Sequence, residues 1–523
     1  MAATQSTSSA NQPPPLTAYN LYEQDTALVE GLRREGGAPW EERVSSFGAV
    51  LGGEPLEWGR LANEHPPTLR THDRYGERVD EIEFHPAWDS LLRLGLDARV
   101  QSLPWLESKP GAHVARAALF MLLGQVEAGV GCPLSMTFAA VPALRAQPDL
   151  AAEWIPRLTS GEALCGMAMT ERQGGSDVRA NETTAGADDD AWLLDGHKWF
   201  CSAPMSDAFL VLAQAPAGLS CFLLERPQSG DWPGFRIERL KDKLGNRSNA
   251  SAEIRLEGAV ARLVGEEGRG IRTILEMVVH TRLDCVLGST ALQRRAVAEA
   301  THHAAHRTAF GRLLAEQPLM QNVLADLCVE SEAATVTALR LARAFDEADG
   351  PFRRLATAVA KFWVCKRTPP LVAEALECLG GNGFVEESQL PRLFRESPLN
   401  SIWEGSGNVN ALDVLRALER EPETAEAFLA EVRLASGADA RLDAAVLRLE
   451  RELGAPDEAG ARRLLELLAL TLQGSLLVRH GAPEVAAAFC ASRLEAPGGV
   501  YGTLPAGLDL AEIVERHRPV ASG

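Results

Sequence analysis

The stretch SIWEGSGN, Ser401 to Asn408, places one carboxylate, Glu404, between the large aromatic side chain of Trp403 and a run of three small residues. An ordinary glutamate on a solvated loop does not need such neighbours. If the stretch shields Glu404 from water, the pKa of its carboxyl rises and it becomes a better general base. A solvated loop charge and a catalytic base are therefore the two interpretations of Glu404.

The composition is that of a globular protein with several domains. The chain has 523 residues, 46% of them hydrophobic and 24% charged, enough to bury large cores. The formal charge of −19 disfavours general attraction to nucleic acid or anionic membranes, although a local basic patch is compatible with it. Nine scattered cysteines without a C-x-x-C pair predict buried thiols in a reducing compartment. The chain begins without a signal-peptide pattern and has no run of 18 apolar residues, so we expect a cytoplasmic protein with no membrane partner.

The pattern of apolar residues divides the chain into helical and β segments. Apolar residues recur at three- and four-residue steps before residue 160 and again after residue 272, which predicts helices. Short alternating runs separated by Gly, Pro, Asp and Ser predict a β-domain between them. We expect an N-terminal extension (1–40) that is disordered over about residues 1–15, followed by an N-terminal helical domain (41–160). A middle β-domain (161–272) and a helical-bundle domain (273–430) come next. The C-terminal helical domain (431–523) is expected to have helices near 441–453 and 461–479.

A second stretch, GMAMTERQGGSDV from Gly166 to Val178, combines glycines with the hydroxyls of Thr170 and Ser176. Bare backbone N–H groups and hydroxyls of this kind can bind a flat ring and its phosphates. A glycine turn between a helix and the β-domain is an equally good interpretation.

Two further stretches have a functional and a plain interpretation each. In GHKWFCS, Gly196 to Ser202, strand alternation puts Phe200 and Ser202 on one face, where they can line a cofactor; an aromatic pair in a strand is more often part of a core. In AAHRTAFGRLL, Ala304 to Leu314, the guanidinium of Arg307 can hold a phosphate. An exposed cation at a helix end is the commoner meaning.

Several common site types are not predicted. The chain has no G-x-x-x-x-G-K-[ST], no G-x-S-x-G, and no G-x-G-x-x-G after a strand, which disfavours nucleotide triphosphatases, serine hydrolases and Rossmann dehydrogenases. His302 and His306 lie four residues apart and can face one metal. Without a third ligand in view, a solvated helix face is the better interpretation, and no metal site is predicted.

Taken together and in order, these motifs resemble the acyl-CoA dehydrogenase family. The corresponding strings are TERQGGSD, GHKWFCS, RTAFG, GGNGF and IWEGS, with DKLGNRS and GEEGRGI at the end of the β-domain. The resemblance covers about residues 40–430, and the long N-terminal extension and the C-terminal tail favour the AidB branch, flavoproteins linked to the adaptive response to DNA alkylation. It implies an N-terminal helical domain, a β-barrel-like middle domain, a C-terminal four-helix bundle and an extra helical C-terminal domain.

The resemblance also implies FAD and its contacts. Thr170 would bond the flavin ring and Ser176 the pyrophosphate, while Ser202 would lie near the reactive flavin nitrogen. Arg307 and the Gly380–Gly383 turn would meet the FAD of a neighbouring subunit, which implies a homotetramer. The full set of expected cofactor-binding residues is Met167, Met169, Thr170, Gly175, Ser176, Phe200, Cys201, Ser202, Arg307, Phe310, Gly380, Gly381, Ile402, Trp403, Gly405, Ser406 and Asn408.

The resemblance makes Glu404 the base that removes the α-proton of an acyl-CoA, with a short branched, isovaleryl-like acyl group as the expected substrate. Arg282 matches a family arginine near the base. Some relatives carry the base on the helix near residue 280, where this chain has Thr281, which cannot serve; Asp284, one turn away, is the only rival. Oxidation of small nitro compounds, and a flavoprotein scaffold with little dehydrogenase activity, are the alternative functions.

DNA binding is implied by the resemblance but not by charge. Residues 431–523 contain ten Arg, no Lys and thirteen Asp or Glu, whereas Lys and Arg contacts to phosphate supply most non-specific affinity for DNA. Either some arginines gather on one face for duplex DNA, or the domain only covers the tetramer. The arginines available for such a face are Arg462, Arg463, Arg479, Arg493, Arg516 and Arg518.

Overall fold

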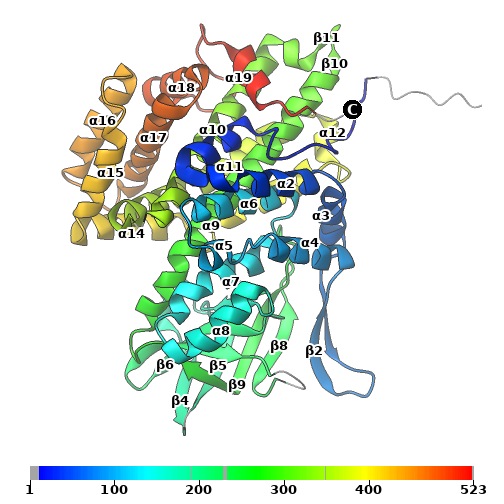
Figure 1. Cartoon of the computed structure of the whole chain (residues 1–523), viewed down its shortest axis with the longest axis vertical. Coiled ribbons are helices and arrows are strands. Elements are labelled where there is room, and N and C mark those ends of the chain that lie inside the picture. Colours follow the sequence, from blue (N-terminus) through cyan, green and yellow to red (C-terminus); the bar gives the residue numbers. More distant parts are fainter. Residues whose placement is uncertain (1–10, 190, 228–231, 348, 521–523) are drawn as a thin grey trace, which may run out of the picture.

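The computed structural model describes residues 11–189, 191–227, 232–347 and 349–520. Figure 1 shows a β-domain at the lower end, a bundle of long helices above it, and a group of C-terminal helices at the upper left. The N-terminal helices pack along the bundle and reach down towards the β-domain. The predicted fold class is confirmed, with helical domains before and after a central β-domain and an extra helical part at the C-terminus.

The N-terminal part is largely helical, as predicted. Its first helix begins after Asp25, whose carboxylate accepts a hydrogen bond from Leu28 N (3.2 Å). Its last helix ends at Gly161, which has φ +83°. An aspartate before the first turn and a left-handed glycine after the last turn are both common at helix termini. The helices are α1 (Thr26–Leu32), α2 (Glu41–Leu51), α3 (Pro55–Glu64), α4 (Pro86–Asp97), α5 (Leu103–Leu106), α6 (Ala112–Val126), α7 (Gly131–Leu144) and α8 (Pro148–Ser160).

The N-terminal extension is more ordered than predicted. Residues 1–10 lie outside the described residues, but the expectation of disorder over 11–15 is wrong. Pro14 O accepts a hydrogen bond from His302 Nε2 (2.8 Å), and the next apolar side chains, among them Leu16 and Tyr19, are buried. Burial of these side chains offsets the entropy lost when the segment is fixed.

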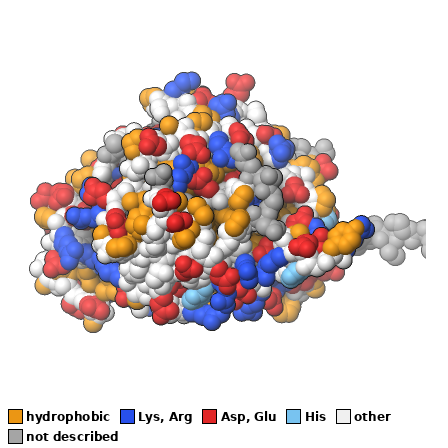
Figure 2. Space-filling model, turned by 90° about the horizontal axis from the view of Figure 1, so that it is seen from below, with side chains coloured by type: hydrophobic (Ala, Val, Ile, Leu, Met, Phe, Trp, Pro, Cys, Tyr) orange, Lys and Arg blue, Asp and Glu red, His pale blue; other side chains and the backbone are white. Residues whose placement is uncertain are grey.

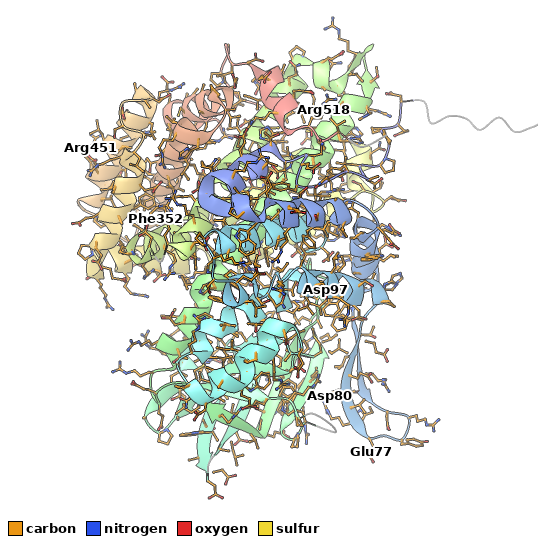
Figure 3. The ribbon with its side chains drawn as sticks, in the orientation of Figure 1. Glu77, Asp80, Asp97, Phe352, Arg451 and Arg518 are labelled. Carbon is orange, nitrogen blue, oxygen red and sulfur yellow. The ribbon has the colours of Figure 1, made fainter. Side chains whose placement is uncertain are left out.

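A β-hairpin interrupts the N-terminal helices, and the sequence reasoning missed it. Its strands are β1 (Thr68–His72) and β2 (Arg78–Glu83), paired antiparallel. Asp80 accepts a hydrogen bond from Ile237 N (2.9 Å) and Arg78 donates to Ile237 O (2.7 Å), so the hairpin is tied to the β-domain. Figure 3 shows Asp80 on the side of the β-domain and Glu77 near the hairpin tip. The alternation in TLRTH and RVDEIE around an Asp-Arg-Tyr-Gly turn was a usable signal.

The middle domain is barrel-like because its strands close a ring. Strands β6, β4, β5, β9 and β7 pair in that order, and β7 pairs again with β6; β3 and β8 extend the sheet from β6 and β9. Closure leaves few free sheet edges. The strands are β3 (Cys165–Ala168), β4 (Thr184–Asp188), β5 (Ala191–Ser202), β6 (Ala208–Ala215), β7 (Gly218–Glu225), β8 (Phe235–Leu240) and β9 (Ser251–Leu263).

The helical bundle is built on three long helices, α9 (Gly270–His306), α10 (Pro318–Asp346) and α11 (Gly350–Cys378), with α14 (Gly407–Arg420) against α11. Small residues let α6 approach α9 closely: a Cβ on Gly124 would lie 3.0 Å from the Cβ of Ala291. The short elements between the long helices are β10 (Thr308–Ala309), β11 (Arg312–Leu313), α12 (Gly381–Phe384) and α13 (Leu390–Glu396).

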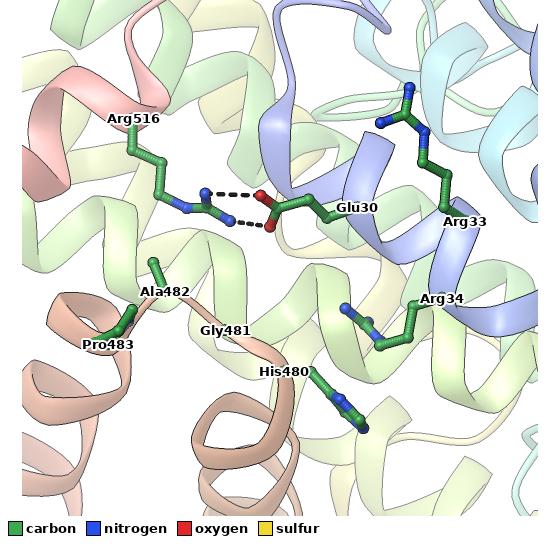
Figure 4. A pocket seen from close by; sticks show the side chains of 8 residues that line it. All are labelled: Glu30, Arg33, Arg34, His480, Gly481, Ala482, Pro483 and Arg516. Atoms are coloured by element: carbon green, nitrogen blue, oxygen red, sulfur yellow. Dashed lines mark hydrogen bonds and ion pairs between the residues drawn. The ribbon is translucent and has the colours of Figure 1, made fainter.

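The C-terminal helices fold back onto the bundle. The two helices predicted here are confirmed as α16 (Ala440–Leu453) and α17 (Ala461–His480); the others are α15 (Glu423–Arg433), α18 (Pro483–Phe489) and α19 (Leu510–His517). Arg516 of α19 pairs with Glu332 of α10 (2.9 Å) and with Glu30 of α1. The Glu30–Arg516 pair crosses a surface hollow of about 740 Å³ between α1, the α17–α18 link and α19 (Figure 4). None of the residues predicted for catalysis or cofactor binding lines this hollow.

The surface and the cysteines agree with the composition. All nine cysteines are buried and free of disulfide bonds, as predicted. On the face shown in Figure 2, Lys and Arg side chains are interspersed with Asp and Glu. Within the described residues, no helix is both long and apolar enough to span a bilayer, and no group of three or more His, Cys, Asp or Glu side chains is placed to hold a metal ion.

Candidate active site

The loop between α13 and α14 holds Glu404 in an unusual backbone conformation. Glu404 has φ +57°, in the left-handed region, and Gly405 follows with φ +96°. A non-glycine residue in this region is strained by roughly 1–3 kcal/mol and persists only where its surroundings fix it. The glycine after Glu404 removes the steric cost of the second left-handed position.

Side chains from three helices hold the carbonyl groups of this loop. Each of four consecutive carbonyl oxygens accepts at least one side-chain hydrogen bond. The bonds run from Lys361 Nζ to Trp403 O (2.8 Å) and to Gly405 O, from Arg282 Nε to Glu404 O (3.1 Å), and from Asn410 Nδ2 to Gly405 O (2.6 Å) and Ser406 O (3.0 Å). The loop is therefore fixed by α9, α11 and α14 together.

The carboxylate of Glu404 is half-buried and points at α9. Thr281 Oγ1 donates a hydrogen bond to Glu404 Oε2 (2.7 Å). Burial raises the pKa of Glu404, while the Thr281 hydrogen bond and the charges of Lys361 and Arg282 lower it. Thr281 is thus a hydrogen-bond partner of the Glu404 carboxylate.

Asp284, the rival carboxylate, is engaged elsewhere. It forms a buried ion pair with Arg116, whose Nη2 lies 2.8 Å from Oδ2. Ser135 Oγ donates to the same oxygen (2.6 Å). Both carboxylate oxygens are occupied by donors, so the structure makes Asp284 a structural residue.

Arg282 lies beside Glu404 but does not contact its carboxylate. Besides the carbonyl of Glu404, its guanidinium donates to Asp413 Oδ2 of α14 (2.7 Å). Arg354 of α11 binds the other oxygen of Asp413 (2.9 Å). Arg282 therefore connects the Glu404 backbone to an ion cluster that joins three helices.

The end of β3 and the loop after it carry the residues of the first motif that are expected to hold the cofactor. Met167, Met169 and Thr170 are half-buried, whereas Gly175 and Ser176 are exposed. Gly175 is needed for close approach, because a Cβ there would lie 2.5 Å from Thr170 Oγ1. The turn therefore packs on Thr170 and leaves backbone and hydroxyl groups accessible.

A buried ion pair that the sequence reasoning did not single out anchors this loop. Lys198 of β5 donates to Glu171 Oε1 (2.6 Å), and neither side chain is exposed to solvent. Glu171 also accepts from the backbone N–H of Glu182 (2.6 Å) and from the hydroxyl of Thr183 (2.6 Å). The available signal was a charged residue inside each of two motifs, TERQGG and GHKWF.

Strand β5 presents Phe200 and Ser202 on one face, as predicted. Phe200 is 49% exposed and Ser202 is half-buried. The side chain of Cys201 is fully buried in the core of the β-domain, and its strand position pairs with Ala252. Only its backbone can face a cofactor, because successive strand residues point to opposite sides.

The two halves of the site meet at α7. Met167, Met169 and Trp403 all pack against the same buried cluster, which contains Cys132. Burial raises the pKa of the Cys132 thiol to about 11; a hydrogen bond with Ser202 lowers it and the charge of Glu404 raises it. The structure thus brings the expected cofactor face and the expected base to one place, where an exposed aromatic, hydroxyls and backbone groups fit a flat, multi-acceptor cofactor.

Other predicted residues lie elsewhere. Phe310, in the β10–β11 turn, is 97% exposed, and Gly380 and Gly381, before and in α12, have no atom near a Cβ position. In Figure 1 these elements lie at the upper right, far from the β-domain. Arg307 lies next to β10. A single chain does not bring these residues to Glu404.

Comparisons with known proteins place the chain in a family. Three family models match consecutive segments: "Adaptive response protein AidB N-terminal domain" over residues 11–162, "Acyl-CoA dehydrogenase, middle domain" over 166–259 and "Acyl-CoA dehydrogenase, C-terminal domain" over 268–419. The Escherichia coli K12 protein described as "Putative acyl-CoA dehydrogenase AidB" is 48% identical over 517 residues, covering 94% of this chain and 95% of that protein. Acyl-CoA dehydrogenase family member 11 of Caenorhabditis elegans is 33% identical and covers 79% of this chain and 73% of its own length.

Solved structures agree with these matches. The crystal structure of Caenorhabditis elegans ACDH-11 in complex with C11-CoA superposes with a TM-score of 0.87 at 29% identity, covering 94% of each chain. Butyryl-CoA dehydrogenase from Megasphaera elsdenii, at 22% identity and a TM-score of 0.59 over 76% of this chain and 97% of its own, shares the fold. The chain therefore belongs to the AidB branch of the acyl-CoA dehydrogenase family, FAD-dependent oxidoreductases that act on CH–CH bonds.

Proposed function

We propose that this protein dehydrogenates short branched acyl-CoA thioesters between Cα and Cβ, with Glu404 as the base. The observation that carries the proposal is the Glu404 carboxylate, held by Thr281 (2.7 Å) at the point where the cofactor loop and β5 meet α7. Burial raises the pKa of this carboxyl, which brings a base closer to the pH at which it works best.

The α-proton of an acyl thioester is weakly acidic, so its removal needs a fixed base and exclusion of water. Glu404 takes this proton, and its fixed backbone sets the direction of approach. Trp403, whose indole donates to Asn400 Oδ1 (2.9 Å), keeps one orientation beside it and limits water. FAD, held by the residues named below, would supply the acceptor for the hydride that leaves Cβ. Gly405 and Ser406 leave room for the thioester, because small residues allow close backbone approach.

The residues that would hold FAD are the accessible ones of the two motifs. The loop from Met167 to Ser176 offers backbone and hydroxyl groups to the ring and pyrophosphate, and Phe200 and Ser202 offer one face of β5. Support comes from their exposure and from the Glu171–Lys198 pair that fixes the loop.

The direct test is an anaerobic titration of the purified flavoprotein with isovaleryl-CoA, following flavin absorbance. We expect the oxidised flavin band to bleach as substrate is added. An oxidised flavin at saturating isovaleryl-CoA would contradict the proposal. Bleaching by a small nitroalkane instead would indicate the alternative oxidase reaction.

We also propose a homotetramer in which Arg307 and Phe310 contact the FAD of a neighbouring subunit. The support is the exposure of three large apolar side chains near the β10–β11 turn and α12: Phe310 (97%), Leu319 (85%) and Phe384 (80%). Monomers rarely expose such side chains together without a partner.

Arg307→Ala is expected to weaken FAD binding and the tetramer together. Loss of one charge-assisted hydrogen bond corresponds to a roughly 10–100-fold increase in the Kd of FAD. Flavin-to-protein ratio and sedimentation velocity measure both effects, with Arg312→Ala on the same hairpin as the matched control. A stable tetramer with full flavin occupancy would rule out this role of Arg307.

A role in the response to DNA alkylation is proposed from the match of residues 11–162 to the AidB N-terminal family model. Most arginines of the C-terminal part are already paired. Those in ion pairs are Arg433, Arg441, Arg463, Arg479, Arg493, Arg516 and Arg518. In the part of the chain that the structure describes, Arg448, Arg451 and Arg462 form no ion pair. Figure 3 shows Arg451 and Arg518 on well-separated helices.

Binding to duplex DNA through this part is therefore expected to depend only weakly on salt. Three free arginines correspond to a slope of log Kd against log salt of about 3 at most. Fluorescence anisotropy with a labelled duplex at several salt concentrations measures it, and Arg451→Ala should lower the slope by about one. A slope of about 6 or more would mean that the ion-paired arginines also bind phosphate.

Nine buried, unpaired cysteines support a reducing, cytoplasmic location for these activities.

A further inference from the structure

A buried lysine lies directly behind the Glu404 loop. Lys361 of α11 is 1% exposed, and its Nζ donates to Trp403 O (2.8 Å) and to Gly405 O. These two carbonyls belong to the residues immediately before and after Glu404. Within the described residues, no carboxylate forms an ion pair with Lys361.

Such an ammonium group is costly to bury. Burying a charge without an opposite partner costs several kcal/mol, so buried charges are normally paired. Here its contacts are two backbone carbonyls, and the charge of Lys361 acts on Glu404. The fold therefore keeps a buried cation in contact with the backbone on both sides of Glu404.

The two contacts fix the direction of the Glu404 side chain. Positive φ at Glu404 and at Gly405 bends the chain so that the carbonyls on either side of Glu404 reach one ammonium group. Because one donor atom binds both peptide units, neither can rotate without losing a hydrogen bond to a buried charge. Arg282 and Asn410 hold the neighbouring carbonyls, but only Lys361 holds both sides of the base.

The charge of Lys361 also favours ionised Glu404. The groups that face this carboxyl come from several elements. On α9, Thr281 and Arg282 favour the ionised form and Asp284 opposes it. On α7, Cys132 is a neutral thiol with a raised pKa. On α11, the charge of Lys361 favours the ionised form of Glu404.

We propose that Lys361 is the positioning residue of the Glu404 base: its ammonium group grips the carbonyls of Trp403 and Gly405 and stabilises the ionised carboxylate. The inference rests on the proposed role of Glu404 as the base. It predicts two separable effects, one on the geometry of the loop and one on the pH at which the base is ionised.

Lys361→Met is expected to lower kcat about 10–100-fold, since small misplacements of a catalytic group have effects of this size. It is also expected to move the acidic limb of the kcat/KM–pH profile to higher pH by about one unit, because an opposite charge nearby favours the ionised form of a carboxyl. The flavoprotein is assayed with isovaleryl-CoA across pH 5–9. An acidic limb that stays in place would overturn the electrostatic part of the proposal.

Three further variants keep the test decisive. Lys361→Arg keeps the charge but changes the geometry, so we expect a reduced kcat with the acidic limb near its wild-type position. If Lys361→Met fails to fold, the acidic limb of Lys361→Gln is compared with that of Lys361→Arg instead. Lys366→Met removes a lysine from the same helix without removing a hydrogen bond to the loop. It should leave the limb unchanged, and an equal shift would point to a general charge effect and against Lys361.

A spectroscopic titration separates this inference from the assignment of the base. Difference infrared spectra of the substrate-free flavoprotein follow protonation of the Glu404 carboxyl, with Glu404→Gln identifying the band. We expect the band to titrate at higher pH in Lys361→Met than in wild type; an unchanged titration would overturn the inference even with Glu404 as the base. Full turnover in Glu404→Gln would instead remove the assignment of Glu404 as the base and leave the effect of Lys361 on the carboxyl measurable.

Discussion

Glu404→Gln is expected to keep the fold and the flavin but to lose dehydrogenation by about 10²–10⁴-fold, the usual contribution of a general base. The glutamine oxygen can still accept the hydrogen bond from Thr281 Oγ1, so the loop should keep its shape. An amide cannot take the α-proton of the thioester. The rate of anaerobic flavin bleaching by isovaleryl-CoA in a stopped-flow instrument measures the loss.

Glu396→Gln is the matched control. Glu396 is a second glutamate whose pKa is raised by burial, to about 7, but it accepts from Asn246 and lies outside the Glu404 loop. A neutral isostere there should leave bleaching within a few-fold of wild type. Equal losses in both variants would mean that buried carboxyls matter to the fold and that Glu404 has no special role. Wild-type bleaching in Glu404→Gln would rule it out as the base.

The sequence predicts those parts of the candidate site whose residues are adjacent in the chain. Trp403, Glu404 and the small residues after them are adjacent, so their sequence alone indicates a shielded carboxylate. Thr281 and Lys361 could not be assigned in the same way. They lie 123 and 43 residues away from Glu404, and only the packing of α9 and α11 brings them to the loop.

The same distinction applies to the fold. Helix periodicity located α10, α16 and α17, because amphipathic helices repeat over many residues. The β1–β2 hairpin is short and was absorbed into a helical segment despite its alternation. Cys201 illustrates a further limit: the motif match counted it among the cofactor-binding residues, but did not say that its side chain lies in the core and leaves only its backbone for such a contact. The limits of the domains stay a prediction.

Glu171→Gln is expected to lower the free energy of unfolding of the β-domain by about 3–5 kcal/mol at pH 7, the usual effect of breaking a buried ion pair on one side. Lys198 would keep its hydrogen bond to Leu212 O (2.7 Å) but lose its only ionic partner among the described residues. The cofactor loop would loosen with it, since Glu171 also holds the backbone at Glu182 (2.6 Å). Urea unfolding of the flavoprotein, with flavin release as a second signal, measures both effects.

The pH dependence of this variant identifies Lys198 as the cause. Burial lowers the pKa of Lys198 to about 8 even though Glu171 raises it, so loss of Glu171 lowers that pKa further. The unfolded chain then binds more protons than the folded one until the pH passes the ordinary lysine pKa of about 10.4. The unfolding free energy of Glu171→Gln should therefore rise between pH 7 and 10. Lys243, whose pKa burial also lowers to about 8, contributes a rise of the same sign in both variants. In Glu171→Gln/Lys198→Met the Lys198 group is gone, so the rise should be smaller than in Glu171→Gln. An equal rise would mean that Lys198 does not cause it and that the buried pair does not control the loop.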